Sequence, residues 1–302
     1  MTTRLLQPTT TVQYPAQSLA TAATVDTRSL LRDALADRLA RADVVLPLPP
    51  RIATEVLALT RDQDADFGRI ARLLHQDPAL AGHVLHIANS PAYLPRSPIV
   101  SLQQAITRLG LRMLAEIALV ASVQCGVFRV PGHEAELRAI WRHALASGAF
   151  GREVARSLRS NVESAFLCGL LHTIGKPLVL QTTLDLARKL DVVASAEDVA
   201  ALIAEFHVRA GGLLASRWNL PRAVCDAIAL YASYDASGAC AQEPVITALS
   251  DCLASHLLAD AADESELRAH RAWSDLNLYP EDADALLAKS PSVSALIDTM
   301  VL

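Results

Sequence analysis

The sequence predicts an all-α protein, and three observations support this fold class. The chain of 302 residues is 52% hydrophobic but only 4% aromatic, and Ala and Leu, both strong helix formers, are frequent. The apolar residues recur at three- and four-residue steps, and no alternation typical of a strand extends beyond a few residues. The breaks between the periodic segments contain Pro or Gly, which interrupt helices.

The first half of the chain predicts a leader followed by an N-terminal helical subdomain. Residues 1–28 are rich in Thr, Gln, Ala and Pro and lack an apolar period, so we expect a disordered leader. Helical periodicity begins near Ser29 and is broken by the proline-rich segment Leu46–Pro50. Ser101 and Gln104 form a capping-box pattern. The further helices are expected over about 51–59, 66–75, 78–89, 101–110 and 111–125.

Pro131-Gly132 is the clearest break and predicts a boundary between two subdomains, 29–132 and 133–302. The N-terminal helical bundle is expected to pack on the second helical subdomain. Helical patterns in the second subdomain cover about 134–158, 164–172, 177–190, 196–218, 221–234, 244–262, 280–289 and 292–300.

Composition excludes several classes of function. A net charge of -5 argues against a general nucleic-acid-binding protein, which needs an excess of Lys and Arg. Arg152, Arg156 and Arg159 recur at helical spacing and indicate a solvated helix face. The five cysteines contain no C-x-x-C pair, which favours a reducing cytoplasm over a disulfide framework or zinc knuckle. No apolar run approaches the length of a membrane span, so no membrane association is expected.

Two histidines and an aspartate are the candidates for chemistry. His172 ends an apolar helical segment and is followed by Gly175 and Lys176, while His143 lies on an earlier predicted helix. Asp251 interrupts an otherwise apolar segment, and a buried carboxylate needs a partner or a metal ion. Imidazoles and a carboxylate from separate helices can hold a metal in a bundle core. The alternative is a hydrogen-bonded core network without metal.

Several motifs resemble those of a known family. The segment Leu170–Lys176, Leu-Leu-His-Thr-Ile-Gly-Lys, resembles the H-D-I-G-K signature of the HD superfamily of metal-dependent phosphohydrolases. Other motifs, from about Leu46 to Ala232, follow an order similar to that of the HDOD family, the HD-related output domain. They are Leu48–Pro50, Gln76–Leu80, Ala88–Ser90, Ser101–Ile106, Arg108–Gly110, Leu137–Ala144, Ala165–Leu167 and Trp218–Pro221. The resemblance implies that the second subdomain is HD-like.

Departures from the family pattern imply that the site has lost catalysis. By resemblance, His143, His172 and Asp251 match three metal ligands, but Thr173 stands where the essential Asp is expected. A neutral hydroxyl is a poor substitute for a carboxylate that bridges two metal ions. Tyr231 stands where many relatives have a histidine pair, and the Gly-Tyr-Pro signature of the cyclic-dinucleotide phosphodiesterases is absent. We therefore expect no catalytic residue, no metal and no other cofactor.

The resemblance implies a non-catalytic bacterial regulatory protein in the cytoplasm. It is expected to bind signalling proteins in trans, in stress, motility or cyclic-dinucleotide pathways. Two alternatives stay open. One is a binding module for a nucleotide or small molecule, in which Lys176 lies near a phosphate. The other is a residual phosphohydrolase with one metal ion on His143, His172 and Asp251.

The loop Asn89–Val100 is the predicted partner-binding site. It contains three prolines together with Tyr93 and Arg96. Proline lowers the entropy lost when a loop is ordered by a partner, and Tyr and Arg are frequent anchors at interfaces.

Overall fold

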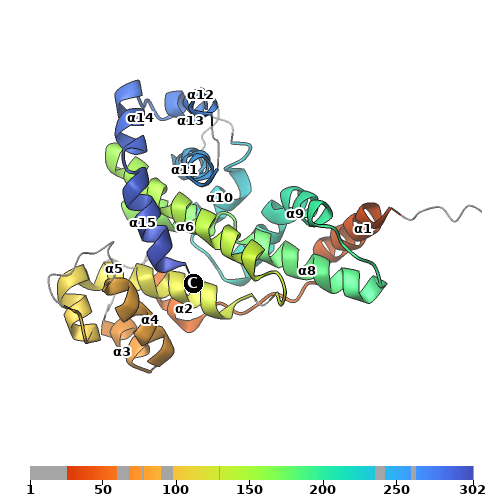
Figure 1. Ribbon diagram of the computed structural model, residues 1–302, viewed down its shortest axis with the longest axis horizontal. Coiled ribbons are helices and arrows are strands. Elements are labelled where there is room, and N and C mark those ends of the chain that lie inside the picture. The colour runs from red at the N-terminus through yellow and green to blue at the C-terminus, as the bar shows by residue number, and fades with distance from the viewer. Residues whose placement is uncertain are drawn as a thin grey trace, which may run out of the picture.

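A computed structural model describes residues 26–59, 68–76, 78–89, 98–128, 130–234, 242–259 and 263–301. Within these ranges the regular structure is entirely helical, which confirms the predicted all-α class (Figure 1). The helices are α1 Thr27–Ala40, α2 Arg51–Leu59, α3 Gly68–Gln76, α4 Pro78–Ala88, α5 Leu102–Gly126, α6 Glu134–Ser157, α7 Val162–Leu171, α8 Gly175–Leu190, α9 Ala196–Arg217, α10 Arg222–Leu230, α11 Gln242–Leu258, α12 Glu264–Arg268, α13 Ala272–Asp275, α14 Pro280–Leu287 and α15 Ser290–Met300.

Local capping explains where several helices begin. The Ser101 hydroxyl accepts a hydrogen bond from the Gln104 backbone N–H, as the capping-box pattern predicts, and thereby satisfies one free donor of α5. Ser195 and Asp198 form a reciprocal capping box at the start of α9. Gly110, where the sequence predicted a helix end, has a φ of 79° and divides α5 into two helical parts.

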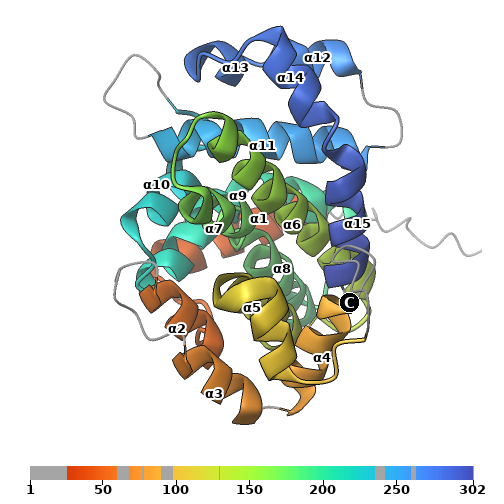
Figure 2. The same cartoon turned by 90° about the vertical axis from the view of Figure 1, so that its left-hand side faces the viewer.

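The second half of the chain is built around α6. This helix packs most extensively against α7 and α11, and α8 packs against α9. Figure 2 shows α11 lying across α6 and α7. The first residue of α8 fits closely against α9, because a Cβ added at Gly175 would lie 1.9 Å from the carbonyl oxygen of His207. These contacts place α6, α7 and α11 against one another, with α8 joining them through α6.

Helices α2, α3 and α4 pack against α5 and form a second group, which the C-terminal helix α15 also contacts (Figure 1). A largely buried ion pair between Glu116 of α5 and Arg152 of α6 links this group to the rest of the molecule. The Arg152 guanidinium also lies 4.6 Å from the centre of the Phe166 ring. The expectation of a fully solvated arginine stripe is therefore wrong for Arg152, because α5 covers that part of α6.

Helix α1 packs against α8 and α9 rather than against α2–α5. Leu31, Leu35 and Leu39 are buried in this interface. Arg28 pairs with Asp198 at 2.7 Å, and Arg32 pairs with Glu205 at 2.6 Å. The sequence analysis placed this helix in the N-terminal subdomain because an apolar face predicts burial but not the partner that covers it. The subdomain boundaries otherwise stay a prediction.

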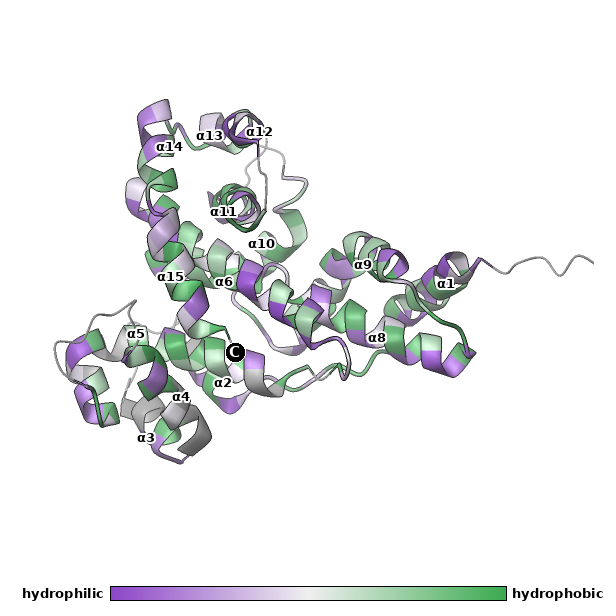
Figure 3. Ribbon diagram, viewed as in Figure 1, coloured by the Kyte–Doolittle hydropathy of each residue, from purple (hydrophilic) through white to green (hydrophobic). Residues whose placement is uncertain are grey.

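Two helices, α12 and α13, were not expected from the sequence, because they are too short to show apolar periodicity. By length and composition alone, α9 is apolar enough to cross a membrane, with 39% of its apolar window buried inside the structure. A core helix meets the same criterion, and α9 packs against α1, α8 and α10. Figure 3 shows hydrophilic as well as hydrophobic residues along it.

Candidate functional site

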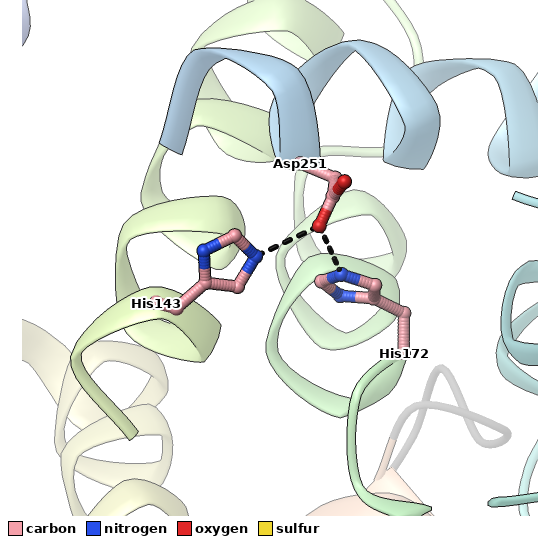
Figure 4. Close-up of side chains that lie close together, drawn as sticks. All are labelled: His143, His172 and Asp251. Atoms are coloured by element: carbon pink, nitrogen blue, oxygen red, sulfur yellow. Dashed lines mark hydrogen bonds and ion pairs between the residues drawn. The ribbon is translucent and has the colours of Figure 1, made fainter. Parts of the chain in front are cut away.

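The structure brings together the three side chains that the sequence analysis singled out. His143 lies on α6, His172 directly follows α7, and Asp251 lies on α11 (Figure 4). Asp251 Oδ1 lies 2.7 Å from His143 Nε2 and 2.9 Å from His172 Nε2. One ligand atom from each residue falls within 4.8 Å of the other two. The predicted cluster therefore exists, contributed by three separate helical segments.

Hydrogen bonding fixes the orientation of His172. Its Nδ1–H donates to the Gly169 carbonyl at 2.7 Å, since a carbonyl can only accept. The ring is fully buried, and burial lowers its pKa. Burial disfavours the charged form of Asp251, but the contacts with His143 and His172 outweigh it and hold the pKa of that carboxyl well below its usual range. Near neutral pH the carboxylate is therefore ionised.

The contact between His172 and Asp251 has a chemical consequence. In a neutral His172 whose Nδ1 carries the proton, Nε2 presents a lone pair to Asp251 Oδ1, which also presents lone pairs. Two atoms that face each other with lone pairs at 2.9 Å repel unless a positive charge lies between them. That charge is either a proton on Nε2 or a metal ion shared by the two ligands. The geometry thus suits a protonated network or a single cation.

The donor set fits one divalent transition-metal ion but does not fit a two-metal centre. Two imidazoles and one carboxylate are common ligands for such an ion. Thr173 occupies the position at which the resemblance expects the bridging carboxylate. Its side chain is buried, and its hydroxyl has no hydrogen-bond partner among the residues that the structure describes. The expectation of a metal-free site stays a prediction.

Tyr231 fills the space beside His172. Its ring meets that of His172 edge-on, with the ring centres 4.6 Å apart. Its hydroxyl lies 2.7 Å from His207 Nε2, while His207 Nδ1–H donates to the carbonyl oxygen of Ile203. His207 Nε2 therefore accepts a hydrogen bond from the Tyr231 hydroxyl. From the sequence, position 231 was interpreted only as a lost metal ligand. The hydrogen bond was not predictable, because the pairing depends on how α9 and α10 pack.

Lys176, the remaining residue of the predicted remnant site, is partly buried at the start of α8. Burial lowers its pKa, and the charge of Asp251 partly opposes that shift. The place of Lys176 in the remnant site stays a prediction.

A cleft of about 570 Å³ opens beside Asp251. Its walls include Tyr231, Tyr234, His270 and Arg271, of which the last two lie between α12 and α13. The guanidinium of Arg271 lies 4.8 Å from the centre of the Tyr234 ring. Sequence reasoning missed this wall because it did not predict α12 and α13.

The predicted partner-binding residues Tyr93 and Arg96 lie outside the described residues. The two ends of their loop are described and are joined by side-chain hydrogen bonds. Asn89 Nδ2 donates to the Ile99 carbonyl, and the Ile99 N–H donates to Asn89 Oδ1, both at 2.7 Å. Asn89 thus holds the ends of the loop together.

Comparisons with known proteins agree with this fold. The sequence model of the HDOD domain matches residues 46–234. An uncharacterised protein of Treponema pallidum (strain Nichols) is 26% identical over 206 residues, which cover 66% of this chain and 39% of the relative. The chain therefore spans well under half of that relative's length.

Solved structures below 25% identity share the fold. An HDOD domain protein with unknown function from Geobacter sulfurreducens has a TM-score of 0.65 at 22% identity and covers 92% of this chain and 99% of its own. A Shewanella amazonensis SB2B protein, provisionally named a metal-dependent phosphohydrolase, has a TM-score of 0.65 at 18% identity, with coverage of 90% and 99%. A Marinobacter aquaeolei VT8 protein, provisionally named for signal transduction, has a TM-score of 0.60 at 21% identity, with coverage of 92% and 67%.

Proposed function

Because the chain belongs to the HDOD family, we propose that it is a regulatory protein of bacterial signal transduction that acts by binding other proteins rather than by catalysis. The observation that carries the proposal is Thr173. Its buried hydroxyl has no hydrogen-bond partner among the described residues, and the family resemblance places it where hydrolysis requires a bridging carboxylate. Stress, motility and cyclic-dinucleotide pathways are the settings we propose, and the cytoplasm is the proposed location.

The chemistry of phosphoester hydrolysis supports the non-catalytic part of the proposal. A two-metal site stabilises the attacking and leaving oxygens of the phosphoryl group together. His143, His172 and Asp251 supply donors for one ion. Tyr231 donates its hydroxyl hydrogen bond to His207. It occupies the position at which many relatives have a histidine pair that can bind metal. One ion without a bridging carboxylate lacks the two-sided clamp on the phosphoryl group.

Metal content and turnover test whether the protein is a metal-dependent phosphohydrolase. We expect purified protein to contain no stoichiometric iron, manganese or zinc by elemental analysis. In the presence of each metal, its hydrolysis of bis-p-nitrophenyl phosphate should equal that of the His172→Ala variant. One equivalent of metal together with turnover, both lost on His172→Ala, would show a residual phosphohydrolase and overturn the proposal.

A variant that restores the missing carboxylate can be compared directly with the parent protein. Thr173→Asp returns the missing carboxylate and is expected to raise metal affinity. Turnover should stay at the background level, because Tyr231 still stands in place of a metal ligand. Full activity in Thr173→Asp alone would mean that position 231 does not matter.

The interaction surface is tested separately. We propose that the loop between Asn89 and Val100 binds the partner through Tyr93 and Arg96. A Tyr93→Ala, Arg96→Ala double variant should keep the circular dichroism and melting temperature of the parent protein and lose the partners recovered by cross-linking and mass spectrometry. Unchanged capture by this variant, together with loss of capture by Lys176→Ala, would place the binding surface at the remnant site instead.

The cleft beside Asp251 favours a second candidate function, ligand binding without turnover. Its volume of about 570 Å³ lies in the range of small-molecule sites. A ligand that binds only the native state raises the melting temperature by mass action. A nucleotide panel that shifts the melting temperature of the parent protein but not of Arg271→Ala would support this function over protein binding.

A further inference from the structure

A second cleft, of about 410 Å³, lies at the connection between α5 and α6. Its walls include Gln124 in the last turn of α5 and Trp141 of α6. Phe128 and Val130, in the segment that connects the two helices, also line the cleft. Trp141 is two residues from His143, which places the two side chains about 160° apart around the helix. The cleft is therefore separate from the cluster of His143, His172 and Asp251.

Two polar atoms in the walls of this cleft have no hydrogen-bond partner among the described residues. They are the indole Nε1 of Trp141 and the amide Oε1 of Gln124, and both are shielded from solvent. The other two tryptophans differ, since Trp218 Nε1 donates to Pro47 O and Trp273 Nε1 donates to Leu267 O, each at 2.8 Å. An unpaired buried donor or acceptor destabilises the native state. A ligand that pairs with both atoms removes that cost.

We propose that this cleft binds a small planar molecule with a lactam edge, in which a ring carbonyl stands beside a ring N–H. The carbonyl accepts a hydrogen bond from Trp141 Nε1, and the ring N–H donates to Gln124 Oε1. The pair follows from the two orphaned atoms, one donor and one acceptor, of residues that line the cleft beside Glu134 and Arg138. Both atoms are closed to water in the structure, so this binding mode requires the Gln124 side chain to rotate when the ligand enters.

The apolar part of the cleft suits a flat ring. Phe128 and Trp141 place their ring centres 6.3 Å apart at an interplanar angle of 39°. Aromatic walls of this kind favour planar ligands, and the volume is within the range of small-molecule sites. A ligand here contacts α5, the connecting segment and α6 together. Its binding therefore stabilises the joint between the two halves of the chain.

The experiment uses the full chain and two lactam probes, 2-pyridone and uracil. Isothermal titration calorimetry should give saturable binding with a dissociation constant on the order of 1 mM, as expected for ligands this small. Binding should also change the tryptophan fluorescence. N-methyl-2-pyridone, which lacks the ring N–H, should bind at least about tenfold more weakly, because it leaves Gln124 Oε1 unpaired.

Two variants test the two proposed hydrogen bonds. Trp141→Phe keeps an aromatic ring and removes the donor, and Gln124→Leu removes the acceptor. Each should weaken 2-pyridone at least about tenfold, whereas Trp218→Phe, outside the cleft, should leave its affinity unchanged. Gln124→Leu decides the question if Trp141→Phe does not fold. Absence of saturation by both probes, equal binding of N-methyl-2-pyridone, or unchanged affinity in a folded variant of Trp141 or Gln124 overturns the proposal.

Discussion

At the scale of a single side chain, Asp251 connects the three helical segments of the candidate site. One of its oxygens contacts both His143 and His172. Asp251→Ala leaves both imidazoles without their acceptor, so it should lower the free energy of unfolding by about 1–3 kcal/mol. Urea titration measures this change, and Asp33→Ala, at an exposed position, is the control. An unchanged value for Asp251→Ala would mean that the carboxylate is solvated.

His207 predicts how stability depends on pH. Burial and the nearby charge of Lys176 lower the pKa of His207, so the native state keeps the imidazole neutral. The unfolded chain binds a proton at this residue near a pH of about 6.5. Its contribution to stability is therefore complete above that pH and is lost as the pH falls further. Between pH 7 and pH 5 the free energy of unfolding should fall less steeply in His207→Gln than in the parent protein, and equal slopes would contradict this.

At the scale of helices, α1 is held by an apolar face and by surface ion pairs, and the two contributions differ in size. Leu35 is fully buried, and Leu35→Ala should lower the free energy of unfolding by about 2–5 kcal/mol through the lost contacts and the cavity. Arg32→Ala should change it little, because its ion pair with Glu205 is exposed. Guanidinium titration of both variants makes the comparison. A larger loss for Arg32→Ala would show that charge, not packing, holds α1.

Helix limits were predictable from sequence where their signals are local. Ser101 caps α5, Gly110 divides that helix, and Pro131-Gly132 precedes α6, all within a few residues of the feature they specify. The packing of α1 was not predictable, since its leucines specify an apolar face but not α8 and α9 as neighbours. The short helices α12 and α13 carry no periodic signal and were missed.

In the candidate site, too, some features were predictable from the sequence and others were not. His143 and His172 were recognisable from the residues around them, and Asp251 from its apolar surroundings. The hydrogen bond between Tyr231 and His207, and the approach of Arg271 to the cleft, depend on contacts between helices that are far apart in the chain. No local pattern specifies such contacts, so the site's donors were predictable and its walls were not.

At the scale of the whole molecule, the buried pair of Glu116 and Arg152 joins α5 to α6. Glu116→Leu leaves the Arg152 charge buried without its acid and should lower the free energy of unfolding by about 3–5 kcal/mol. The double variant Glu116→Leu, Arg152→Met should regain part of that loss, because no charge is then buried. Thermal and urea unfolding of the three proteins test this. A double variant no more stable than Glu116→Leu would mean that the pair itself does not explain the loss.

Gly175 has a packing role that does not depend on the chemistry of the candidate site. With only 1.9 Å between a Cβ at this position and the carbonyl oxygen of His207, any other residue forces α8 and α9 apart. Packing therefore requires a glycine at position 175, whatever the chemistry of the neighbouring site. The glycine of the Leu170–Lys176 motif thus has a packing role of its own, so its presence in the motif does not by itself indicate catalytic activity.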